Sequence, residues 1–337
     1  MARFLLKSFL PLVFLIACSP SSRNVTSHGS TSNQVVSNNS TSRTQPPVES
    51  LLPIDTTGSD HKDSLLNTKP LSLMDLPQTE DGEVVLSEGF YEADFKSYCL
   101  QPGTPSPSDR DAYRQGPLTA YRKDIVETIL RNSLKKPELE QRNIQLLLWS
   151  VVSGSDFRKL SWEVQATAQQ LLTRKQIFEL QGGVMGVVRT VSMALPETGA
   201  ANQMKQLFEM GNSSYEAFER VAVLQQSSHI TKTEIKKDQW YKQPDGYWLR
   251  YFPSSYQHVK VQVYVPQGTI EKNSNAYLLF DPVTMMAIPA NSNSQRLGIG
   301  APTIDVIRKI IQIQRIPPPP TEKPPVKSQN PKEVIMK

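Results

Sequence analysis

Cysteine and histidine are scarce in this chain, and the few that occur are scattered. The 337 residues include two cysteines, Cys18 and Cys99, and four histidines. His229 and His258 have no cysteine, histidine or pair of acidic residues near them at the spacing of a metal site, so we expect no zinc. The sequence also lacks a glycine-rich phosphate loop and the Gly-x-Ser-x-Gly turn of serine hydrolases. These absences favour a non-enzymatic protein with no catalytic residues, no metal and no cofactor.

Neither charge nor apolar sequence is concentrated enough to indicate a nucleic-acid partner or a membrane-spanning helix. The formal net charge of +5 is small for 337 residues, and the basic residues form no cluster. A nucleic-acid partner is therefore not expected. No apolar run reaches the roughly twenty residues that a helix needs to cross a bilayer.

Aromatic residues are missing from a long N-terminal stretch. No Phe, Tyr or Trp occurs between Phe14 and Phe90, and residues 19–46 are rich in Ser, Thr and Asn. Such a segment buries too little apolar surface to offset the entropy lost on folding. We therefore predict that residues 18–82 form a disordered tether, and that the proline-rich residues 317–337 form a disordered tail.

Residues 1–17 have the pattern of a secretion signal peptide. Arg3 and Lys7 supply positive charge, and a mostly apolar run from Phe9 to Ala17 follows. A charged start before a short apolar stretch is typical of a signal that is removed after export. The run ends in Leu15-Ile16-Ala17-Cys18, which resembles the lipobox of bacterial lipoproteins.

The lipobox resemblance implies that Cys18 becomes the first residue of the mature protein and carries lipid. The family places a diacylglycerol on the sulfur, and stable anchoring takes at least two acyl chains, such as palmitate. Ser19 in place of an aspartate predicts sorting to the outer membrane, facing the periplasm. The first acidic residue is Glu49, so no acidic signal for export follows Cys18, and the cell surface is the alternative location. Lipid on Cys18 leaves Cys99 without a disulfide partner.

From residue 83 to residue 228 the apolar residues recur mainly at helical spacing. Thr173 and Gln176 have the spacing of a capping box at the start of one helix. Residues 101–117 are rich in proline and glycine, so we expect no regular structure there. The apolar residues that define two of the helices are Ile125, Val126, Ile129 and Leu130, and then Ile144, Leu147, Leu148 and Val151. This pattern predicts a mainly helical domain over residues 83–228.

Beyond residue 228 the pattern changes to alternation. Val259, Val261, Val263 and Val265 alternate with polar residues, as in a half-buried strand. Residues 243–246, Gln-Pro-Asp-Gly, form a hairpin turn signal between two aromatic-rich segments. Residues 303–316 are rich in isoleucine and favour a helix. The predicted fold class is therefore α+β: a helical domain, followed over residues 229–316 by a small antiparallel β domain with a terminal helix.

Two short motifs together resemble the thioester domains of bacterial surface adhesins. The first is Tyr98-Cys99, and the second is Ile144-Gln145-Leu146-Leu147-Leu148-Trp149. The family has an aromatic-Cys pair and, later, a Thr-Gln-x-Ala-x-Trp motif; Ile144 and Leu147 depart from it here. The resemblance implies that Cys99 supplies the thiol and Gln145 the acyl group of an internal thioester, which captures an amine and is shielded by Trp149. In the simpler interpretation Cys99 is a small buried hydrophobe, Gln145 a solvated helix residue and Trp149 a core aromatic.

Aromatic side chains are concentrated in the predicted β domain. Trp240, Trp248 and Tyr251 offer rings on which a glycan such as peptidoglycan could stack, provided that one sheet face is free. Packing of both faces is the alternative interpretation.

The sequence thus predicts a lipid-anchored, non-enzymatic accessory, assembly or binding component of the bacterial cell envelope. The expected partners are the membrane and an envelope protein or glycan. The alternatives are a thioester-bearing adhesin, acting through Cys99 and Gln145, and a glycan-binding β domain.

Overall fold

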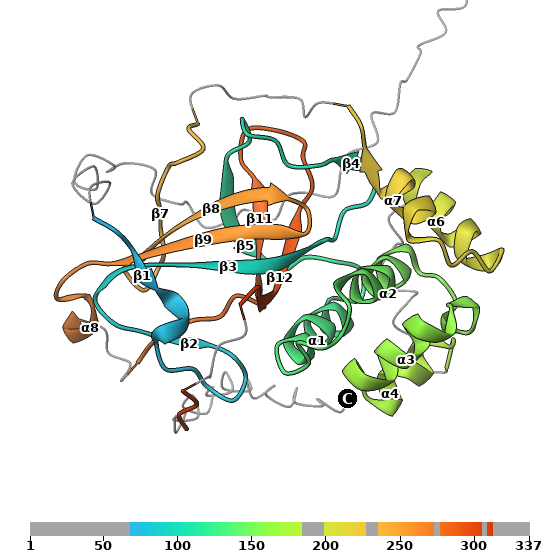
Figure 1. Ribbon diagram of the computed structural model, residues 1–337, viewed down its shortest axis with the longest axis horizontal. Coiled ribbons are helices and arrows are strands. Elements are labelled where there is room, and N and C mark those ends of the chain that lie inside the picture. Colours follow the sequence, from blue (N-terminus) through green and yellow to red (C-terminus); the bar gives the residue numbers. More distant parts are fainter. Residues whose placement is uncertain (1–67, 184–198, 227–234, 273–276, 305–308, 313–337) are drawn as a thin grey trace, which may run out of the picture. The chain divides into compact units, whose positions relative to one another are not determined.

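The computed structural model describes residues 68–183, 199–226, 235–272, 277–304 and 309–312 (Figure 1). The predicted signal peptide, Cys18, most of the predicted tether and the proline-rich tail lie outside these residues. The end of the predicted tether is described: it contains strand β1 (Leu71–Ser72) and a short 3-10 helix, η2 (Leu73–Asp75).

Six antiparallel strands close into a barrel. Each strand is hydrogen bonded to two neighbours, in the order β3–β9–β8–β5–β11–β12 and back to β3. Closure removes the free edges that an open sheet would expose. The six strands are β3 (Gly89–Cys99), β5 (Tyr113–Pro117), β8 (Trp248–Ser255), β9 (His258–Val265), β11 (Met285–Pro289) and β12 (Leu297–Pro302).

The barrel interior is filled by side chains that alternate along the strands. On β9 the four valines predicted to face inward are each at most 1 % exposed, which confirms that strand. Tyr251 on β8 lies opposite Tyr113 on β5, and both are 1 % exposed. The interior is therefore a packed core.

Further short strands lie outside the ring of six: β7 extends the large sheet beside β8, and two other pairs form separate two-stranded sheets. The predicted hairpin around residues 243–246 is confirmed, because β7 pairs with β8 across it. The short strands are β2 (Val84–Leu86) paired with β10 (Leu278–Phe280), β4 (Thr104–Pro105) with β6 (Val223–Leu224), and β7 (Tyr241–Lys242) with β8.

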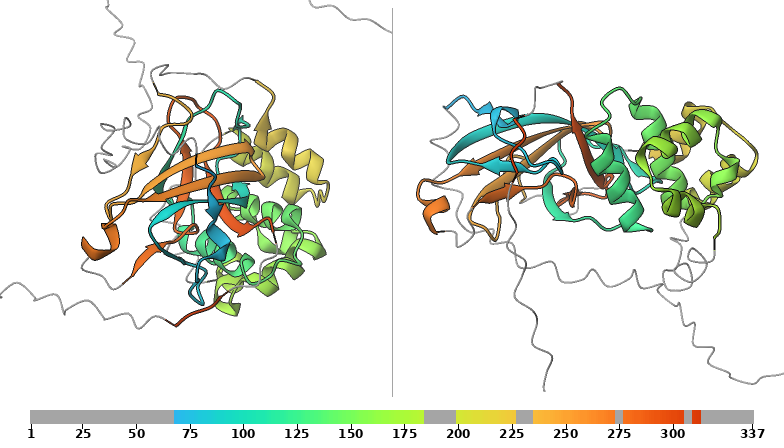
Figure 2. Two further views of the ribbon diagram at one scale, coloured as in Figure 1. Left: turned by 60° about the vertical axis from the view of Figure 1, so that its left-hand side comes forward. Right: turned by 90° about the horizontal axis from the view of Figure 1, so that it is seen from below.

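Most of the described helices form one insertion between β5 and β7. The insertion lies to one side of the barrel in Figures 1 and 2, with α1 against β12 and α2 against β3. The predicted capping box at Thr173 and Gln176 is present at the start of α4. The helices of the insertion are α1 (Lys123–Ser133), α2 (Gln141–Ser153), η3 (Phe157–Lys159), α3 (Trp162–Leu171), α4 (Arg174–Leu180), α6 (Gly199–Glu209) and α7 (Tyr215–Ala222), and α8 (Thr269–Lys272) follows β9.

The predicted fold class, a helical domain followed by a separate β domain, is wrong. β3 and β5 lie within the part predicted to be mainly helical, yet they pair with β9, β8, β11 and β12 from the part predicted to be the β domain. β5 also lies within residues 101–117, where we expected no regular structure. The barrel thus takes strands from both sides of residue 228, and the helices interrupt it.

The predicted terminal helix is also not observed where the chain is described. Of residues 303–316, the stretch 309–312 is not helical, and Ile310 instead forms a parallel bridge with Gln78. The bridge therefore places Ile310, near the C-terminal end of the described chain, beside Gln78, near its beginning.

Two glycines on β12 allow Tyr98 of β3 and Leu130 of α1 to lie close to the strand. A Cβ atom on Gly300 would fall 2.6 Å from Cε2 of Tyr98, and one on Gly298 would fall 3.0 Å from Cδ1 of Leu130 on α1. Both distances are shorter than ordinary van der Waals contact, so a side chain at either position must displace its neighbours.

We predict that Gly300→Val destabilises the protein by about 1–3 kcal/mol, the usual cost of overpacking a buried site. The measurement is the urea unfolding midpoint of the full-length protein. Gly199→Ala is the control, because Gly199 is exposed at the start of α6 with no atom within 4 Å of an added Cβ. The control should change stability by no more than about 0.5 kcal/mol; equal midpoints for the two variants would contradict the proposed close approach.

Candidate functional site

The two motifs that suggested a thioester meet at the end of β3. β9 pairs with β3 as far as Lys96 opposite His258, and beyond Ser97 it no longer runs beside β3. The Gln145 side chain takes the place of the missing strand. The Cys99 N–H donates a hydrogen bond to Gln145 Oε1 at 2.8 Å, and Gln145 Nε2 donates one to the Cys99 carbonyl at 3.0 Å. One carboxamide therefore satisfies both main-chain groups of the cysteine.

A second glutamine on the same helix face extends this pairing. Gln141 lies four residues before Gln145, which places both side chains on one face of α2. Gln141 Nε2 donates to the carbonyls of Ser97 at 3.0 Å and Gln257 at 2.7 Å. The α2 helix is thus fastened along the last residues of β3. The apolar residues of α2 position it against the core, and Gly154, with a left-handed φ of 67°, ends it.

Trp149 lies one turn beyond Gln145 and seals the site. Its side chain and that of Cys99 are both 0 % exposed, and Gln145 is 1 % exposed. The Trp149 ring stacks on Tyr215 at 5.6 Å between centroids and lies 6.3 Å from the ring of Tyr256. The prediction that Cys99 and Trp149 are core residues is correct in this respect, whereas Gln145 is buried rather than solvated.

The Cys99 thiol is held in its protonated form. Burial raises the pKa of the thiol to about 12, and the nearby N–H groups of Trp149 and Gln101 oppose this effect only in part. Cys99 is a free cysteine. Because the thiolate is the nucleophilic form, the thiol has little reactivity near neutral pH as long as the site stays closed.

Hydrogen-bonded polar side chains surround the two tyrosines that lie against Trp149. The hydroxyls of Tyr215 and Tyr256 are 2.8 Å apart, and Gln257 Nε2 donates to the Tyr215 hydroxyl at 2.9 Å. The Tyr256 hydroxyl donates to the Glu219 carboxylate. Burial, and then the hydrogen bond to Glu219, raise the pKa of Tyr256, so its proton stays in place. The network ties α7 to the turn between β8 and β9.

Sequence reasoning identified Cys99, Gln145 and Trp149 but missed the residues that complete the site. Gln141 carried a usable signal, because it lies one helical turn before Gln145. Tyr215 and Tyr256 carried none, since only the folded barrel brings α7 and the β8–β9 turn to Trp149.

The three aromatic residues predicted to bind a glycan do not form one surface. Tyr251 is 1 % exposed inside the barrel, and Trp240 is 6 % exposed. Trp240 is covered by the Arg250 guanidinium, 4.2 Å from its ring, and packs edge-on against Phe90 at 5.8 Å. Trp248 is partly exposed, with Lys242 Nζ 5.9 Å from its ring. Two of the three rings therefore serve packing, as in the alternative interpretation.

Within the described ranges, no cluster of three or more Cys, His, Asp or Glu side chains is suited to a metal ion. No helix in the same part of the chain has the length and apolar character needed to span a membrane. The lipidation candidate, Cys18, lies outside the described residues.

No protein-family model, curated protein or solved structure matches the chain.

We predict that Gln145→Met destabilises the protein by about 2–6 kcal/mol. Methionine fills a similar volume but leaves the buried N–H and C=O of Cys99 without partners, at about 1–3 kcal/mol for each group. The measurement is urea unfolding of the full-length protein. Gln169→Met is the matched control, because Gln169 is exposed on α3 and its replacement should have little effect. If the two variants unfold at the same urea concentration, Gln145 does not support β3.

Proposed function

We propose that the protein is a lipid-anchored, non-enzymatic binding or assembly component of the bacterial outer membrane, facing the periplasm. The observation that carries this proposal is the sequence Leu15-Ile16-Ala17-Cys18 at the end of a charged and then apolar N-terminus. Lipid on Cys18 would hold the barrel near the membrane through the predicted tether.

The state of Cys99 supports the non-enzymatic part of the proposal. The one nucleophile that the sequence singled out is sealed and protonated, and Gln145 is engaged with its main chain. An envelope protein is the better partner than a glycan, because Trp240 and Tyr251 are buried and offer no free ring.

We predict that the wild-type protein incorporates labelled palmitate and fractionates with the outer membrane, and that Cys18→Ser abolishes the label. The measurement is metabolic labelling followed by membrane fractionation. Cys99→Ser is the matched control, since it alters the other cysteine of the chain, and it should keep both the label and the location. Label that persists in Cys18→Ser would disprove lipidation at this residue.

A second candidate function is favoured by one specific contact: the Gln145 carboxamide lies against the main chain of Cys99, the residue that carries the thiol. In thioester formation the Cys99 sulfur would bond to the Gln145 side-chain carbonyl carbon, the carbon–nitrogen bond of the amide would break, and ammonia would leave. An amine on a target would then take the acyl group and restore the thiol. Trp149 and its stacked tyrosines would keep water from the bond.

If the thioester forms, the Cys18→Ser protein should be lighter than its sequence mass by one ammonia. Gln145→Ala in the same background should have its full sequence mass, because it has no acyl group to condense. Methylamine should add to the first protein and not to the second. The measurement is intact mass spectrometry. A full mass together with complete alkylation of Cys99 after unfolding would end the thioester hypothesis and leave the anchored binding protein.

A further inference from the structure

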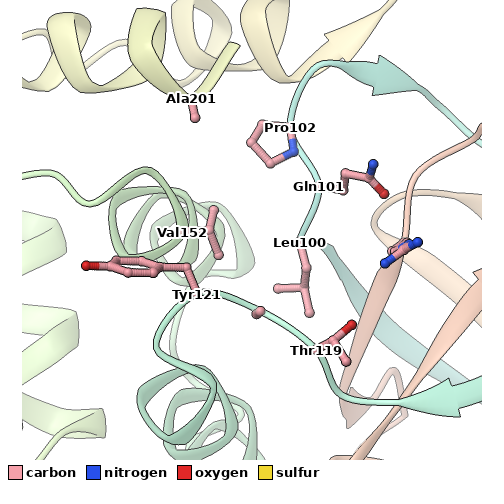
Figure 3. Close-up of a pocket in the computed structure, with 9 residues that line it drawn as sticks. Leu100, Gln101, Pro102, Thr119, Tyr121, Val152 and Ala201 are labelled. Carbon is pink, nitrogen blue, oxygen red and sulfur yellow. The ribbon is translucent and has the colours of Figure 1, made fainter. Parts of the chain in front are cut away.

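A small cavity lies between the barrel and the helical insertion, one residue beyond Cys99. Its volume is about 160 Å³, and it lies between the loop after β3, the C-terminal part of α2 and the start of α6 (Figure 3). Apolar side chains form most of the wall, and the polar lining residues are Gln101, Thr119 and Arg296. The apolar lining residues are Leu100, Pro102, Ala120, Tyr121, Val152 and Ala201.

Arg296 lines this cavity, and no acidic side chain of the described residues pairs with its guanidinium. It is partly buried, and its guanidinium has no ion pair and no hydrogen bond with any residue of the described chain. None of the described residues that line the cavity is acidic. Arginine is seldom buried unless it is paired, because its charge loses hydration without compensation.

A second arginine adds to the positive charge. Ala287 on β11 pairs with Leu297 on β12, so the next residues of the two strands, Ile288 and Arg296, lie opposite each other. On its other side Ile288 pairs with Arg114 on β5. The row Arg296–Ile288–Arg114 therefore crosses three strands on the outer face of the barrel. The Arg114 guanidinium likewise has no ion pair within the described chain. Burial lowers the pKa of Arg296, and the charge of Arg114 lowers it further, although arginine stays charged near neutral pH.

A third arginine lies beside the same wall. The Arg122 guanidinium is 5.3 Å from the ring of Tyr121, which lines the cavity. Its Nη1 atom is buried and makes no hydrogen bond to the described residues. One arginine, Arg296, therefore lines the cavity, and two others lie close to residues of its wall: Arg114 acts on Arg296, and Arg122 lies over Tyr121. The cavity lining, as far as the structure describes it, includes no acidic side chain.

We propose that this cavity binds a carboxylate carried on a short apolar stem, with the carboxylate on Arg296 and the stem on the apolar wall. The planar guanidinium matches a carboxylate with two parallel hydrogen bonds. An amine is excluded by the like charge of the arginines. A phosphate dianion would place a second charge against apolar walls that cannot hydrate it. The cavity is smaller than the roughly 300–1,000 Å³ of sites that enclose a whole ligand, so it receives only the end of a molecule.

This proposal does not depend on the lipid anchor or on the thioester. The carboxylate has two sources of the same chemistry: a free short-chain monocarboxylate, or the C-terminal end of a peptide whose last residue is small and apolar. Butyrate represents the first source. N-acetyl-alanyl-alanine represents the second, and its C-terminal amide is the matched ligand without the charge.

The test is calorimetric titration of the full-length protein in a non-ionic detergent at low salt. We expect binding of butyrate or of the acetylated dipeptide, and at least tenfold weaker binding of the dipeptide amide. Binding of the dipeptide at least tenfold tighter than butyrate identifies a peptide end as the source, and the reverse order identifies a free acid. No binding of either carboxylate, or equal binding of the amide, overturns the proposal.

Two variants locate the site. Arg296→Gln should weaken carboxylate binding at least tenfold, as expected when a charged hydrogen-bond donor is lost. It should not impair folding, because it removes a charge that has no partner among the residues that the structure describes. Ala201→Leu should block binding from the α6 side while Arg296 is kept. Arg174→Gln, at an exposed position on α4, is the control and should bind as the wild type does. Unchanged binding in Arg296→Gln overturns the assignment.

Discussion

The last residues of β3 have no neighbouring β9 residue, so their main-chain N–H and C=O groups need other hydrogen-bond partners. Side chains of α2 supply these partners, and this contact attaches the helices to the barrel. A buried N–H or C=O without a partner costs about 1–3 kcal/mol, so the strand end cannot simply be left unpaired. The ring of six strands is already closed and offers no further strand. A glutamine side chain has both a donor and an acceptor, and Gln145 uses them on the two main-chain groups of Cys99.

The same contact explains why the barrel and the helices fold as one body. Gln145 and Gln141 lie on α2, which also contacts α1, α3, α6 and α7. Fixing α2 to β3 therefore fixes the insertion to the barrel. In the other direction, α1 covers the glycines of β12, and Tyr256 from the β8–β9 turn reaches Glu219 on α7. The helices and the barrel thus each complete the other's core.

Local patterns in the sequence predicted some of the elements, but they could not predict closure of the barrel. The valine alternation of β9 and the turn between β7 and β8 depend on neighbouring residues, and both are observed. β5 and β12 are short and contain glycine and proline, Tyr-Arg-Gln-Gly-Pro and Leu-Gly-Ile-Gly-Ala-Pro, so they have the composition of turns. Gly298 and Gly300 are there because α1 and Tyr98 lie close to the strand, a tertiary reason that a single sequence does not display.

Three residues of the candidate site were predicted from the sequence, but its geometry and its remaining residues were not. Two motifs placed Cys99 and Gln145 together although 46 positions separate them, and the structure brings them within hydrogen-bonding distance. The sequence could not show that the contact is with the main chain of Cys99, because that depends on where β9 ends. Two of the three aromatic residues predicted to contact a glycan are buried for a related reason: Arg250 covers the ring of Trp240, and Tyr251 lies inside the barrel.

The thiol and the cavity are neighbours in the chain but face different surroundings. Cys99 is the last residue of β3 and pairs with Leu297, whereas Leu100 lines the cavity. Successive residues of a strand point to opposite faces, so a ligand in the cavity meets Leu100 and not the thiol. An occupant can reach the chemistry of Cys99 only by moving the main chain at the end of β3. Gln145 holds both main-chain groups of Cys99 from α2, and Val152 of the same helix lines the cavity, so α2 contacts both sites.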